Sequence, residues 1–224
     1  MSASTTTIEA PAGAGEGRAR RLVLFGTPLA LGLVTLVHPV VRRSPAVELQ
    51  GRVGLWLGVH LLQLGLLCLL AMTVWLLVDG LPGRAAAVSR AALLPFVAFY
   101  GAFDALVGIA TGQMVRRAAQ LPQAAVTADV LWAGRLHDPL VGAVVLPAVL
   151  AWLTASLAAA LALARAGAPR SGVAALVVAG LLLAVDHAPP FGPLAMLWLL
   201  IAVAILERRP ARAPATAPDA PEAA

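Results

Sequence analysis

The chain has 224 residues, of which 60% are hydrophobic and only 12% are charged, with a formal net charge of +5 and a mean hydropathy of +0.88. Ordinary globular domains carry about 25% charged residues, so this composition is typical of an integral membrane protein. All basic residues are arginine and the only cysteine is Cys68. The lack of lysine excludes a retinal Schiff base, a pyridoxal-phosphate anchor and a Walker-A loop, and the single cysteine excludes an internal disulfide, a CxxC redox pair and a thiolate zinc site.

Four apolar stretches are long enough to cross a bilayer, whose hydrocarbon core of about 30 Å needs roughly 20 helical residues. They cover residues 22–41, 53–78, 91–114 and 139–164, and two shorter stretches follow at 172–186 and 190–206. The short segment between the last two predicts a helical hairpin. We therefore expect an all-α integral membrane protein whose six transmembrane helices form one bundle over residues 21–208.

The arginines predict the orientation of this bundle, because cytoplasmic loops of membrane proteins carry an excess of basic residues. More arginines fall on the cytoplasmic side if both termini lie inside, which gives an N-in, C-in topology. We expect residues 1–20 and 209–224, which are rich in Ala, Pro and Gly, to be disordered cytoplasmic tails. A rival interpretation, a cleaved signal peptide at the first stretch, requires a shorter apolar segment of about 7 to 15 residues.

The composition also predicts the location of the protein. A chain rich in Ala and Arg and without Lys is typical of a GC-rich bacterial genome. Together with the apolar stretches, this bias predicts a multi-pass protein of a bacterial plasma membrane. The expected partners are the lipid bilayer and either a second copy of the chain or another membrane subunit, and no nucleic acid is expected.

Ionisable side chains inside a membrane are costly, so each of them is a candidate functional residue. The expected topology brings all four histidines, which are His38, His60, His137 and His187, toward the outer side. Asp104 is the only formal charge deep in a span, and a rise of about 1.5 Å per residue puts it near the midplane. These residues are candidates for one outer-facing site, although hydropathy does not fix how the helices are ordered around the bundle.

Polar residues at helical spacing predict a small cavity at this site. In the second span, Trp56, His60 and Gln63 share one face, because residues three or four apart are neighbours on a helix. By the same spacing, Asp104 shares a face of the third span with Tyr100, which lies one turn before it, and with Gly108 and Thr111, which lie one and two turns after it. The alternative is that Asp104 only forms hydrogen bonds that hold the helices together. The predicted cavity residues are Trp56, Gln63, Tyr100, Thr111 and Asp186.

Small residues predict the position of the third span. Gly108 and Gly112 form a GxxxG pattern, which lets helix backbones approach closely in a membrane. We therefore expect the third span to lie centrally in the bundle.

The histidines favour a metal or haem site, because neutral imidazoles bind zinc, copper and haem iron. His60 and His187 are the leading ligands, followed by His38, and His137 is a further candidate. Asp104 is the expected catalytic proton acceptor or orienting group. Six outer arginines are candidates for binding the propionates of a haem, since guanidinium groups pair with carboxylates in a bidentate manner. They are Arg42, Arg43, Arg52, Arg116, Arg117 and Arg135.

The favoured function is redox or hydrolytic chemistry at this site, with haem b, zinc or copper as the cofactor. One alternative is a small proton-coupled transporter that uses Asp104, because a titratable carboxylate in a span can carry a proton. Another is an accessory membrane subunit without chemistry of its own. The sequence leaves open whether the chain is an enzyme.

Overall fold

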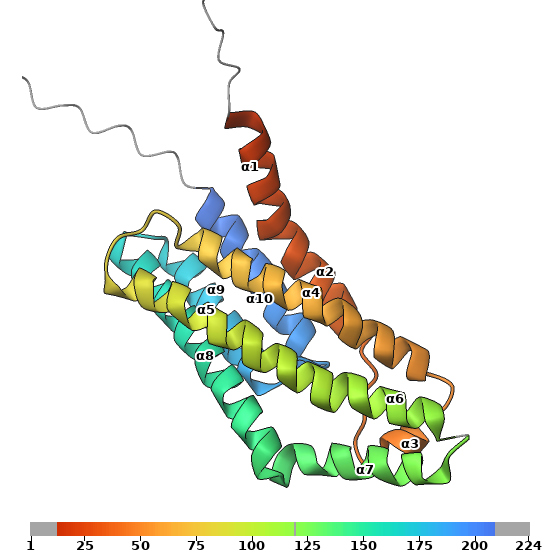
Figure 1. The fold of residues 1–224 in the computed structure, drawn as a ribbon. Coiled ribbons are helices and arrows are strands. Elements are labelled where there is room, and N and C mark those ends of the chain that lie inside the picture. Colours follow the sequence, from red (N-terminus) through yellow and green to blue (C-terminus); the bar gives the residue numbers. More distant parts are fainter. Residues whose placement is uncertain (1–12, 119, 209–224) are drawn as a thin grey trace, which may run out of the picture.

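The structure, a computed structural model, describes residues 13–118 and 120–208, and within these ranges its regular elements are all helical (Figure 1). The first membrane helix combines α1 (Gly13–Arg21), a π-helical turn η1 (Leu22–Gly26) and α2 (Thr27–Leu36). This helix begins inside the segment expected as a tail and ends before the expected boundary at residue 41. The end at Leu36 has a local cause, because Pro39 disfavours helical geometry in the residue that precedes it.

Three further helices are long and apolar enough to cross a membrane. They are α4 (Val53–Leu77), the continuous helix Arg84–Arg117 and α8 (Pro139–Arg165). The second of these consists of α5 (Arg84–Phe103), a π-helical turn η2 (Asp104–Ile109) and α6 (Ala110–Arg117). With the first helix, the described residues contain four candidate membrane spans, so the chain is a multi-pass membrane protein.

The two shorter apolar helices form a hairpin, as the sequence predicts. They are α9 (Arg170–Val185) and α10 (Phe191–Glu207), and they pack against each other. The hairpin belongs to the bundle, because α9 also packs against α8 and α10 packs against α2. The indole nitrogen of Trp152 in α8 donates a hydrogen bond of 2.9 Å to the carbonyl of Gly180, which fixes α8 against α9.

Two helices close one end of the bundle. The four-residue helix α3 (Pro45–Glu48) and α7 (Pro122–His137) lie across the ends of the long helices (Figure 1). Asp129 of α7 accepts hydrogen bonds of 2.9 and 3.1 Å from the hydroxyl of Ser44, directly before α3. At the opposite end, Arg20 and Glu207 pair and connect α1 to α10.

The core of the bundle is formed by buried side chains of α2, α4, α5, α8, α9 and α10. α5 packs along α8, where the hydroxyl of Ser89 donates a hydrogen bond of 2.9 Å to the carbonyl of Ala155. On the other side, η2 and α6 pack against α4 at Gly108 and Gly112. The third helix therefore contacts α4, α7 and α8, but it is less buried than α4, so its small residues mark close helix contacts rather than the central position that they predict.

The outward faces of the helices are apolar. Leu61 in α4, Leu94 in α5 and Leu146 in α8 are among the large hydrophobic side chains that are more than half exposed. Soluble proteins rarely expose so many contiguous apolar side chains, so these faces fit contact with lipid. Of the tails expected at 1–20 and 209–224, residues 1–12 and 209–224 lie outside the described residues.

Candidate metal centre

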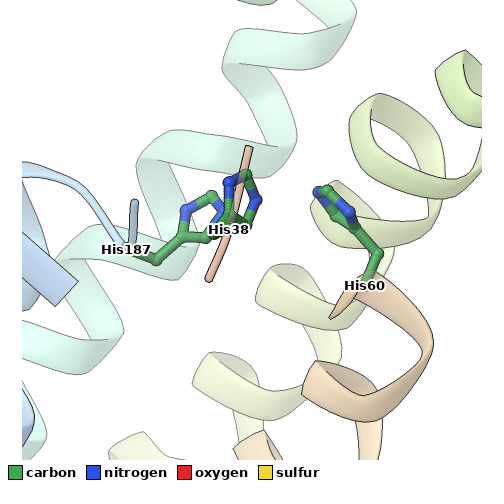
Figure 2. A group of neighbouring side chains, drawn as sticks. All are labelled: His38, His60 and His187. Atoms are coloured by element: carbon green, nitrogen blue, oxygen red, sulfur yellow. The ribbon is translucent and has the colours of Figure 1, made fainter. Parts of the chain in front are cut away.

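Three histidines from distant parts of the sequence meet near the end of the bundle that carries α3 and α7. His38 lies in the loop after α2, His60 lies in α4 and His187 lies in the turn between α9 and α10. One ring nitrogen from each histidine lies within 4.8 Å of the other two (Figure 2). The ring of His38 stands between the others, with centroids 4.9 Å from His60 and 5.1 Å from His187.

The Nδ1 atom of each histidine already faces an oxygen. His38 Nδ1 lies 2.8 Å from the carbonyl oxygen of Pro39, and His60 Nδ1 lies 2.8 Å from that of Trp56. A carbonyl oxygen can only accept a hydrogen bond, so in both rings Nδ1 carries the hydrogen and Nε2 keeps its lone pair. His187 Nδ1 lies 3.5 Å from a carboxylate oxygen of Asp186, which favours the same tautomer.

The Nε2 atoms are therefore the free ligand atoms of the cluster. Those of His38 and His187 are buried, and within the described part of the chain they have no hydrogen-bond partner. Leaving such a group unsatisfied costs roughly 1–3 kcal/mol, so buried polar atoms normally have a partner. Metal-binding histidines commonly direct one ring nitrogen to the metal and the other to a carbonyl or carboxylate oxygen. The Nδ1 hydrogen bonds of His38 and His60 fit this pattern, and His187 Nδ1 lies near a carboxylate oxygen.

Asp104 lies beside the histidines at the first position of the π-helical turn η2. Its side chain is 1% exposed, and one of its oxygens lies 4.0 Å from Nε2 of His60. Neither carboxylate oxygen has a hydrogen-bond partner among the described residues. A buried ionised carboxylate without a partner is very costly, so this position calls for a cation, a water or a proton.

The π-helical turn brings the backbone of the third helix against the ring of His60. A Cβ atom on Gly108 would lie only 1.9 Å from Cδ2 of His60, so the ring occupies space that any other residue would fill. The carbonyl of Gly108 also accepts a hydrogen bond of 2.7 Å from Nε1 of Trp56. Single π-helical turns within α-helices occur frequently at functional sites. Here the turn contains both Gly108 and Asp104.

The turn that carries His187 is fixed by its own backbone contacts. Asp186 accepts a hydrogen bond of 2.9 Å from the backbone nitrogen of Ala188. A Cβ atom on Gly192 would lie 1.8 Å from the carbonyl oxygen of His187, so α10 begins directly against the turn. Burial lowers the pKa of the His187 imidazole and keeps it neutral, which is the form that binds metal ions.

A cavity of about 230 Å³ adjoins the cluster. Its walls include the three histidines and Asp104 together with four large aromatic side chains, and they come from α4, the third membrane helix, α7, α8 and the end of α9. The aromatic residues are Trp56, Tyr100, Phe103 and Trp132. The cavity is large enough for an ion, a few waters and part of a substrate.

The structure brings together only part of the residue set that the sequence suggests. Three of the five predicted cavity residues line the cavity, whereas Gln63 and Thr111 are buried outside its lining. The side chains of His137 and Arg135 lie outside the described residues. The other five arginines proposed for a haem are exposed and are not part of the cavity wall, and they are Arg42, Arg43, Arg52, Arg116 and Arg117.

Sequence reasoning missed two features of the site. The carbonyl of Pro39, which orients His38, follows from a backbone turn that no side-chain pattern signals. Gly108 is visible as a packing residue in the GxxxG pattern, but the pattern does not show that the glycine faces His60.

No protein-family model, curated protein or solved structure matches this chain, so the geometry of the site alone supports a functional proposal.

Proposed function

We propose that His38, His60 and His187 bind one divalent transition-metal ion and that the protein uses it for chemistry inside the membrane. The observation that carries the proposal is the shared pattern of the three rings. Each Nδ1 faces an oxygen, and the cluster presents three ring nitrogens within 4.8 Å of one another. A cation between the rings would give the buried Nε2 atoms of His38 and His187 the partner that they lack among the described residues.

Zinc fits this ligand set best. Catalytic zinc sites use three protein ligands and keep a fourth position open for water or substrate, with Zn–N distances of about 2.0–2.1 Å. Tetrahedral ligand atoms at that distance are roughly 3.4 Å apart. Small rotations of the rings would bring the three ring nitrogens, now within 4.8 Å of one another, to this separation. Asp104 lies 4.0 Å from His60 and borders the cavity, where it would face the open position. Copper shares the preference for imidazole and is the second choice.

A haem has weaker support from the same geometry. The cavity of about 230 Å³ is smaller than the roughly 300–1,000 Å³ of typical ligand and cofactor sites. The five described arginines that would bind propionates are not part of its wall. A small ion fits both observations better than a macrocycle does.

Metal content of the purified protein tests the proposal. After exposure to zinc and removal of the excess, wild-type protein should retain about one zinc ion per chain by mass spectrometry. His60→Ala and His187→Ala should lose it. Thr73→Val is a matched control, because Thr73 is a buried polar residue of the same helix α4 that does not line the cavity. Wild-type protein that retains neither zinc nor copper would refute a metal site, and a Soret band lost in both histidine variants would identify haem instead.

A proton-coupled metal carrier is the second candidate, because Asp104 is buried next to the cluster and has no hydrogen-bond partner in the part of the chain that the structure describes. Carboxylates in membrane spans frequently act as proton relays. Reconstitution into liposomes that contain a pH-sensitive dye separates this function from catalysis. Zinc-driven proton movement that disappears in Asp104→Asn would favour the carrier.

For the topology, we propose six crossings with both termini inside, in a bacterial plasma membrane. The packing of α9 and α10 against α8 and α2 supports two further crossings beyond the four long helices. In a Cys68→Ala background, a membrane-impermeant maleimide should label Gln50→Cys and Pro190→Cys from outside but not Asp79→Cys. Labelling of Asp79→Cys alone would reverse the orientation, and protection of Pro190→Cys would remove the last two crossings.

A further inference from the structure

The cavity wall limits the charge of a substrate. Asp104 and Asp186 are its two formally charged residues, and it contains no arginine among the described residues. The rest of the wall is mostly aliphatic and aromatic, with residues such as Val107, Val149 and Leu183. A phosphate or carboxylate group would meet two carboxylates there and no cationic side chain, so the bound metal ion would be the only positive charge to offset that repulsion. The wall therefore favours a reacting group without negative charge.

Where the cavity wall reaches the outer surface of the bundle, at its rim, the exposed side chains are mostly apolar. Val40 is 46% exposed and Val185 is 65% exposed, and both also line the cavity. On α8, Leu146 and Leu150 lie next to lining residues in the sequence and are 60% and 53% exposed. Exposed apolar side chains in this position border lipid, so a membrane-dissolved molecule can reach the cavity without crossing water. Asp186, whose side chain is half exposed, is the charged residue at this rim.

Asp104 is placed to remove a proton from a water at the metal site. Its carboxylate lies 4.0 Å from Nε2 of His60, and its oxygens have no donor within the described residues. A water in the adjoining cavity, beside this pair, can hydrogen-bond to the carboxylate and contact the ligand cluster. Tyr100 lies one helical turn before Asp104 and lines the same cavity, so its hydroxyl is the candidate donor to a substrate oxygen.

We propose, building on the metal site above, that the protein hydrolyses an uncharged acyl ester or amide that is dissolved in the membrane. Asp104 takes one proton from the attacking water, and the water oxygen forms a bond to the carbonyl carbon while the C=O π electrons move onto the carbonyl oxygen. When those electrons return, the C–O or C–N bond breaks. The proton passes from Asp104 to the leaving alcohol or amine, and the other product is a carboxylic acid. No oxidant or reductant is needed.

The test uses zinc-loaded protein in nanodiscs and 4-nitrophenyl octanoate as an uncharged acyl probe. Wild-type protein should hydrolyse it, and Asp104→Asn should be about 100-fold slower or worse, since general acid–base groups contribute roughly 10²–10⁴-fold. Zinc content and thermal unfolding of Asp104→Asn should match those of the wild type. Tyr100→Phe should keep its zinc and lose about tenfold in rate. Thr73→Val should retain the full rate.

The outcomes separate this inference from the metal site itself. If wild-type protein binds no zinc or copper, both proposals fall. If it binds zinc but Asp104→Asn hydrolyses octanoate as fast as the wild type, only the hydrolytic inference falls. Faster cleavage of the water-soluble acetate ester than of the octanoate would refute the membrane-dissolved substrate. Faster cleavage of bis(4-nitrophenyl) phosphate than of octanoate would refute the uncharged acyl group. If Asp104→Asn loses its zinc, the rate of octanoate hydrolysis by Tyr100→Phe is the test instead. A rate equal to that of the wild type would then refute the proposed site chemistry.

Discussion

Trp56 donates its indole N–H to the carbonyl oxygen of Gly108 at 2.7 Å, and its own backbone carbonyl accepts the hydrogen of His60 Nδ1 at 2.8 Å. One residue therefore connects the π-helical turn of the third membrane helix to the orientation of a candidate ligand. The close approach of Gly108 to the His60 ring completes this arrangement. The position of His60 consequently depends on how α4 packs against the third helix.

The first prediction concerns Gly108→Ala. The new methyl group would lie 1.9 Å from Cδ2 of His60, so the ring must move or the helices must separate. We expect zinc affinity to fall at least tenfold and the thermal unfolding temperature to decrease, and a zinc competition titration measures the first effect. Gly101→Ala is the matched control, because a Cβ there has no neighbour within 4 Å. Equal zinc affinity in both variants would mean that Gly108 does not position His60.

The second prediction concerns the indole hydrogen bond. Trp56→Phe keeps a large aromatic ring but leaves the buried carbonyl of Gly108 without this donor. The loss should destabilise the protein by roughly 1–3 kcal/mol, which is the usual cost of an unsatisfied buried group. Unfolding in mixed detergent measures the free energy. Trp75→Phe is the control, since Trp75 is 41% exposed on the same helix. A similar loss in the two variants would assign the effect to ring size rather than to the hydrogen bond.

The long helices could be predicted from the sequence because burial in lipid demands uninterrupted apolar runs. The second span was expected at 53–78, and α4 covers Val53–Leu77. The end of the first helix was harder to predict, since apolar residues continue to Val41 while the backbone leaves the helix near Pro39. Hydropathy reports whether a residue tolerates lipid and does not report whether its backbone is helical.

The candidate site could be predicted only in part, and Thr111 shows why. The sequence places Thr111 on the same face as Asp104, which assumes a regular helix of 3.6 residues per turn. A π-helical turn from Asp104 to Ile109 intervenes, and one extra residue per turn rotates the following residues by about 100°. Thr111 is buried away from the cavity as a result. The meeting of His38, His60 and His187 depends on the order of helices in the bundle, which no local pattern encodes.

The third prediction concerns Asp186, which would orient His187 in the candidate metal site. Its carboxylate lies 3.5 Å from His187 Nδ1 and also accepts a hydrogen bond from the backbone of Ala188. Removing such a partner of a metal-binding histidine typically costs 10–100-fold in affinity, so Asp186→Ala should weaken zinc binding by about that factor. Asp186→Asn retains an acceptor oxygen and should lose less. If both variants bind zinc as tightly as the wild type, Asp186 does not orient the ring.

The last prediction concerns the loop between the first membrane helix and α3, and it is a pH dependence. Glu48 accepts hydrogen bonds of 2.9, 2.7 and 2.9 Å from the backbone nitrogens of Arg42, Arg43 and Ser44. These three N–H donors lower the pKa of Glu48 below its ordinary value of 4.5. The folded pKa is therefore lower than the unfolded one, so the stabilisation is complete above about pH 4.5 and is lost as the pH falls through the folded value.

This dependence can be measured by comparing Glu48→Gln with the wild type. The glutamine variant should unfold at a lower temperature near neutral pH, because its neutral amide accepts the three N–H groups less strongly than a carboxylate does. The difference should shrink below about pH 4.5, as Glu48 of the wild type becomes protonated. Glu16→Gln in α1 changes charge equally without touching this loop, so its effect should not follow the same pH course. A constant difference between Glu48→Gln and wild type from neutral pH to well below 4.5 would show that the ionised carboxylate does not stabilise the loop.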